Sequence, residues 1–176
     1  MINKKAQIWV ETVIYTLIGL ALIGLVLAIA TPRINEFRDK AIIEQTIDAL
    51  NIFDSKINEI LSAPGNIRII EFNMRRGDLY FNTTENKILY VMEDSRVIFS
   101  EPDVEISLGR INVTTTEGTK RHTVSLLLDY SYNLTFNGID GETVKFSGVS
   151  VPYRFSVENK GFQEVGKINI DIREIS

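Results

Sequence analysis

The spacing of hydrophobic residues changes twice along the chain. From Ala6 to Ala30 the residues are mostly apolar or small, and Glu11 is the only charged one among them. A run of this length is enough to cross the ~30 Å apolar core of a bilayer as an α-helix. We therefore predict a transmembrane helix over residues 8–30.

Beyond Pro32 the apolar residues recur at close to the helical period, with charged residues between them. They are Ile34, Phe37, Ala41, Ile47, Leu50, Phe53, Ile57, Ile60 and Leu61. The pattern predicts one long helix over residues 7–63, which Pro64 and Gly65 end. Pro32 should kink this helix, because its ring blocks one intrahelical hydrogen bond. The apolar face from Phe37 to Leu61 is expected to cover one side of a sheet.

From Ile67 onward the pattern changes to alternation with period two, which is typical of half-buried strands. The clearest segment is 124–136, where alternate residues are apolar, and we predict one long strand there. Further strands are expected at Ile67–Asn73, Asp78–Asn82, Lys87–Met92, Val97–Ser100, Val104–Thr115, Thr143–Phe146, Val149–Val157 and Lys167–Ile175.

The resulting fold class is α+β, with a long N-terminal helix packed on an antiparallel β-sandwich or curled sheet. About seven to nine strands are expected. The predicted divisions are a basic leader at 1–6, the helix at 7–63 and a β domain at 64–176.

Composition excludes several classes of function. The chain has no cysteine, so disulfides and thiolate chemistry are ruled out. Its net charge is −4 and no basic patch points to nucleic acid. His122 is the only histidine and is interpreted as a surface residue, and the turn carboxylates form no calcium-loop motif. We therefore expect neither an enzyme nor a cofactor or metal site.

Three Asn-x-Thr sequons occur, at Asn82, Asn112 and Asn133. Composition alone would produce a similar number. Their phase in the predicted strands places each asparagine on a polar face. These positions are candidate glycosylation sites if the β domain lies outside the cell.

Glu11 requires an explanation, because an ionisable group in an apolar helix is costly and is by default a functional hypothesis. Ala6 is the one small residue between the basic leader and the helix, so a cut between Ala6 and Gln7 would leave Gln7 as the new N-terminus. Glu11 would then lie about one helical turn from a free amino group. The amino group of a neighbouring subunit could pair with Glu11 and set the register between subunits. Alternatively, the segment is a plain signal anchor whose Glu11 is hydrated near the interface.

The segment that contains the leader, Gln7 and Glu11 resembles the class III signal segment of archaeal type IV pilin-like proteins. That segment reads Gln-x-Ser-x-Glu-x-x-x-Leu after the cleavage point. Gln7 and Glu11 match it, whereas Trp9 replaces the usual Ser and Tyr15 the usual Leu. The resemblance covers about the first sixty residues. It implies cleavage by a membrane prepilin peptidase and assembly by pilus machinery.

Two hypotheses of function follow. The first is a structural pilin, major or minor, which is a membrane protein as a precursor and then part of a helical cell-surface filament of its own copies or related pilins. Such a filament needs a non-closing contact between subunits. The second is a membrane-anchored extracellular binding module that does not polymerise.

Overall fold

The computed structural model describes residues 4–162 and 166–175, with side chains from Ile8 onward. Within it the chain divides into two compact units, Met1–Arg38 and Asp39–Ser176. The second unit, called the head below, contains every described strand and the second half of the helix. This division falls inside the helix. The predicted divisions at 1–6, 7–63 and 64–176 stay predictions.

Helix α1 extends from Lys4 to Ile60 and continues through Pro32. Its last turn is capped from the head, because Asn159 Nδ2 donates to the Ile60 carbonyl at 2.8 Å. Gly65 follows with a φ of 83°, and its N–H donates to the Asn159 carbonyl at 2.7 Å. The Pro64–Gly65 signal thus lies in the turn after the helix, and the helix ends three residues earlier than predicted. The kink at Pro32 stays a prediction.

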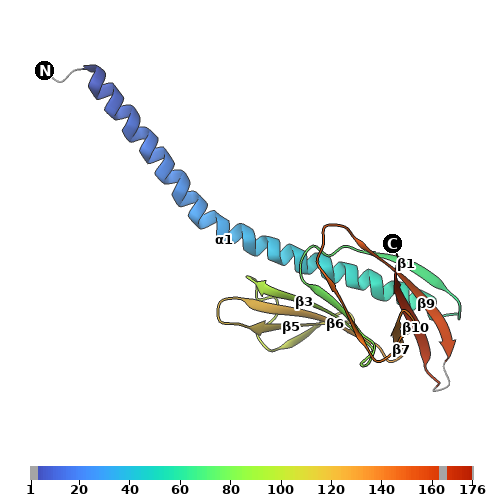
Figure 1. The fold of residues 1–176 in the computed structure, drawn as a ribbon. Helices are drawn as coiled ribbons and strands as arrows, with labels where there is room; N and C mark the ends of the chain where they lie inside the picture. The colour runs from blue at the N-terminus through green and yellow to red at the C-terminus, as the bar shows by residue number, and fades with distance from the viewer. Residues whose placement is uncertain (1–3, 163–165, 176) are drawn as a thin grey trace. The chain divides into compact units, whose positions relative to one another are not determined.

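The described residues form ten strands in two sheets (Figure 1). The four-stranded sheet has the order β1 (Ile67–Phe72), β9 (Tyr153–Phe162), β10 (Ile168–Glu174) and β7 (Asn133–Phe136). The six-stranded sheet has the order β4 (Glu105–Leu108), β5 (Ile111–Glu117), β6 (His122–Asp129), β3 (Lys87–Ser95), β2 (Asp78–Asn82) and β8 (Thr143–Ser147). Neighbouring strands are antiparallel except β7 and β10, which are parallel. The α+β class with a long helix on an antiparallel-rich β domain is confirmed.

The second half of α1 is part of the core of the head. Phe53 on α1 contacts Phe72 of β1 and Phe155 of β9, and also Phe81 of β2. These contacts reach both sheets, so the helix closes the space between them (Figure 1). The apolar side chains of α1 that are buried are Ile43, Ile47, Leu50, Phe53, Ile57 and Ile60.

The buried face of the helix starts later than the sequence predicted. Ile34 and Phe37 are 55% and 72% exposed, and Ala41 is exposed too. The helical period continues through these residues, but only from Asp39 onward does the helix belong to the head. The prediction that Phe37 faces a sheet is therefore wrong.

The predicted long strand over 124–136 is wrong, because the chain changes sheets in the middle. β6 ends at Asp129 in one sheet, and β7 begins at Asn133 in the other. Asn86, with a φ of 58°, stabilises the segment in which the chain passes from one sheet to the other. Its carbonyl accepts from Tyr130 N at 3.1 Å and its side chain accepts from Leu134 N at 2.8 Å. Alternation continues across the break, so the pattern does not reveal it.

Three other predicted strands also need correction. Segment 104–115 is a hairpin of β4 and β5, which turns at Gly109 with a φ of 67°. Segment 97–100 is not a strand, because Ser100 and Thr115 exchange backbone-to-hydroxyl bonds instead of a ladder. The strand expected from Val149 begins only at Tyr153, since Val149 N donates to the Met74 carbonyl in a loop.

Candidate functional site

The first half of α1 has apolar side chains on every side. Of the described residues, this is the one helix long and apolar enough to span a membrane. Residues 8–31 extend over about 36 Å at ~1.5 Å per residue, more than the apolar thickness of a bilayer. None of the most apolar stretch is buried against the rest of the protein. This surface is therefore available to lipid or to other helices.

The threonine hydroxyls in this run are satisfied inside the helix. Thr12 Oγ1 donates to the Ile8 carbonyl at 2.9 Å, and Thr16 Oγ1 to the Thr12 carbonyl at 2.9 Å. Thr31 Oγ1 donates to the Leu27 carbonyl at 2.7 Å. Bonds of this type let a hydroxyl enter an apolar environment without an external partner. The threonines therefore need no partner outside the helix. The remaining strongly polar side chain of this segment is the carboxyl group of Glu11.

The predicted cleavage residues, Ala6 and Gln7, and the predicted assembly residue, Glu11, belong to one continuous helix. Glu11 lies on the exposed surface of α1. The backbone of Ala6 and Gln7 is helical, whereas their side chains and residues 1–3 of the leader lie outside the described residues. Cleavage between Ala6 and Gln7 and the role of Glu11 stay predictions.

Asp39 is a buried carboxylate at the point where the head begins. It is 2% exposed and accepts from Arg76 Nη1 at 2.5 Å and from Arg96 N at 2.9 Å. Arg76 also donates to the carbonyls of Glu93 and Asp94, at 3.0 and 2.8 Å. A buried carboxylate needs such partners to be stable. Asp39 therefore anchors α1 to the two loops that carry Arg76 and Arg96.

A second acidic residue on the buried face, Asp54, was also missed by the sequence reasoning. Asn58 donates to its Oδ2 at 3.0 Å, and Arg110 Nε lies 3.6 Å from its Oδ1. The rings of Tyr130 and Tyr132 stack on each other near Asp54, where Tyr130 is buried and Tyr132 is half-buried. Burial, reinforced by the negative Asp54, raises the pKa of the Tyr132 hydroxyl well above its usual range. Asp39 and Asp54 have the same helical spacing as Ile43, Leu50 and Ile57. The sequence could have indicated their burial, because the pattern places both acids on the apolar face of the helix.

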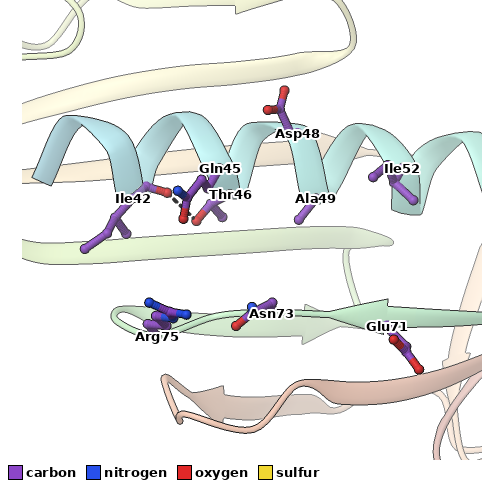
Figure 2. A pocket seen from close by; sticks show the side chains of 9 residues that line it. All are labelled: Ile42, Gln45, Thr46, Asp48, Ala49, Ile52, Glu71, Asn73 and Arg75. Carbon is purple, nitrogen blue, oxygen red and sulfur yellow. Dashed lines mark hydrogen bonds between the residues drawn. The ribbon is translucent and has the colours of Figure 1, made fainter. Parts of the chain in front are cut away.

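A shallow groove separates the exposed side of α1 from β1 and the loop behind it (Figure 2). It has a volume of about 410 Å³. On the helix side it is lined by Ile42, Gln45, Thr46, Asp48, Ala49 and Ile52, and on the other side by Glu71, Asn73 and Arg75. The mixed charges and open shape give no arrangement suited to acid–base or nucleophilic chemistry.

The other candidates from the sequence are spread over the head. His122 begins β6 and is half-buried. Within residues 8–162 and 166–175, no group of three or more His, Asp or Glu side chains is placed to hold a metal. Asn82 ends β2, Asn112 lies in β5 and Asn133 begins β7, all half-buried.

No family model, curated protein or solved structure matches this chain. The assignment of function therefore depends on the helix and the head themselves.

Proposed function

We propose that the chain is a pilin-like structural subunit, which polymerises into a surface filament through the first half of α1. The observation that carries the proposal is the helical segment 8–31, apolar on every side, exposed, and interrupted by a single charge at Glu11. A precursor would hold this segment in the membrane. After removal of residues 1–6, copies of the segment would pack against one another in the filament core, with the heads outside.

Glu11 is assigned the role of setting the register between subunits. Cleavage before Gln7 creates a cationic amino group about one helical turn from Glu11. In a water-poor core, a carboxylate is stable only with a cationic or hydrogen-bonding partner, and the amino group of a neighbouring subunit provides one.

The experiment uses Glu11→Gln and Glu11→Ala in the native host, with Thr16→Val as the control on the same helix. The expected result is that both Glu11 variants are processed to a chain beginning at Gln7 and accumulate in the membrane. They should yield at least tenfold less sheared filament than the unsubstituted protein, since about 1.4 kcal/mol already changes an equilibrium tenfold. Thr16→Val should assemble normally.

Two results would contradict the proposal. Normal filament yield from Glu11→Ala would remove the assigned role of the charge. A protein that stays entirely in the membrane fraction after shearing, with or without the substitutions, would favour the anchored binding module.

A further inference from the structure

The sequon at Asn82 differs from the other two in both residues that a transferring enzyme must reach. Its asparagine nitrogen has no hydrogen-bond partner in the part of the chain that the structure describes, and its threonine is exposed. Asn82 is the last residue of β2, and its Oδ1 accepts from Glu85 N at 3.0 Å in the hairpin turn that follows. Within the described residues, its Nδ2 makes no hydrogen bond. Thr84, the third residue of the sequon, is exposed in the same turn. The turn thus fixes the carboxamide by its oxygen and leaves the nitrogen available.

In each of the other two sequons, a side chain that the transferring enzyme must reach is hydrogen-bonded within the fold. Asn112 Nδ2 donates to Glu105 Oε1 at 2.9 Å, and its Oδ1 accepts from Ser107 at 3.0 Å. At the third sequon, Thr135 is 2% exposed and its hydroxyl donates to Asp171 Oδ1 at 2.9 Å. A transferring enzyme that reads the folded chain could not reach this hydroxyl.

Asn82 also borders an apolar trough on the outer face of the six-stranded sheet. In β2, Leu79 and Phe81 are buried in the core, so Tyr80 and Asn82 project from the opposite face. Tyr80 pairs across the strands with Leu89, and Leu89 with Leu127. The trough has a volume of about 240 Å³, and Tyr80, Leu89, Val91 and Leu127 form its apolar part.

This trough is smaller than the ~300–1,000 Å³ typical of pockets for drug-sized ligands, and it suits a single sugar ring. One face of a pyranose is lined by C–H groups and packs on aromatic rings and aliphatic side chains. Glu85 and Lys87 lie at the polar side of the trough, where sugar hydroxyls need partners. A saccharide attached at Asn82 would therefore cover the half-buried side chains of Tyr80, Leu89 and Leu127. It would share the Tyr80 ring with Lys145, whose Nζ lies 5.5 Å from the ring centroid.

We infer that Asn82 is an N-glycosylation site of the folded head and that the first sugar lies against Tyr80 and Leu89. The inference depends on the proposed function in one respect, since the head must lie outside the cell. The donor is a lipid-phosphate-linked saccharide. Asn82 Nδ2 forms a bond to the anomeric carbon, the bond from that carbon to the phosphate oxygen breaks, and the lipid phosphate leaves. Nδ2 gives up one proton to a base of the transferring enzyme.

The test is peptide mass spectrometry of the processed protein from its native host. The expected result is one sugar adduct, on the peptide that contains Asn82, lost in Asn82→Gln and in Thr84→Ala. Thr84→Ser keeps the sequon and should keep the adduct, and Asn112→Gln should keep it as well. If Asn82→Gln does not fold, the comparison of Thr84→Ala with Thr84→Ser still tests the site.

A second measurement tests the trough. The sugar should raise the urea midpoint of the unsubstituted head above that of Thr84→Ala, and this difference should disappear in a Tyr80→Ser background. Sugar on Asn112 or Asn133 at comparable occupancy, an unmodified Asn82, or a difference that survives Tyr80→Ser would overturn the inference. A protein found in sheared filaments without sugar would refute this inference alone. A glycosylated protein that never leaves the membrane would refute filament assembly alone.

Discussion

Replacing Phe53 by alanine tests whether the second half of α1 is part of the core of the head. Phe53 is fully buried, and its ring centroid lies 6.3, 5.8 and 6.1 Å from those of Phe72, Phe81 and Phe155. Phe→Ala at such sites lowers the free energy of unfolding by about 3–5 kcal/mol. Because whole domains have only ~5–15 kcal/mol, the substitution should remove a large share of the stability.

The assay is urea unfolding of a fragment that begins at Arg33, which omits the apolar helix and should be soluble and folded. With a slope of about 2 kcal/mol per M, a loss of ~4 kcal/mol lowers the midpoint by about 2 M. Ile52→Ala is the matched control, because Ile52 is the preceding residue of the same helix and is 56% exposed. Its free energy of unfolding should change by no more than ~0.5 kcal/mol, so its midpoint should stay close to that of the unsubstituted fragment. Equal midpoints for the two variants would show that the helix does not pack on the two sheets of the head.

Three further outcomes are expected. A fragment that begins at Pro64 lacks the buried helix face and should aggregate, which size-exclusion chromatography detects, and an equally stable monomer would contradict the packing described above. Asp39→Ala leaves the Arg76 guanidinium without its buried carboxylate and should cost roughly 3 kcal/mol, the low end for buried pairs because Arg76 is one-third exposed. Burial raises the pKa values of Tyr130 and Tyr132 above the ~10 of an unfolded tyrosine. Their contribution to the free energy of unfolding is therefore complete below pH ~10 and is lost as the pH rises further. The urea midpoint of the fragment should fall above that pH and fall less in Tyr132→Phe, and an identical pH profile for that variant would refute the assignment.

The sequence by itself determined the long helix, most of the strands, and the buried face of several of them. The run from Ile8 to Ala30 is apolar on all sides, which is sufficient to predict a helix whose surroundings are not water. Alternation predicted β2 with the bounds that the structure has, and it placed Asn82 on the face opposite to the buried Leu79 and Phe81. These properties are local, because the period of the backbone alone decides which side chains share a face.

Only the tertiary structure decided which strands pair and where the helix joins the head. Alternation is the same whichever sheet a strand enters, so the change of sheet at Tyr130 left no trace in the pattern. The contacts that fix it come from Asn86, more than forty residues away in the chain. The helical spacing places Asp39 on the apolar face, but only the fold supplies the partners, Arg76 and Arg96, that allow its carboxylate to be buried there. Charge burial depends on partners brought together by the fold, and the sequence pattern of a single helix does not contain them.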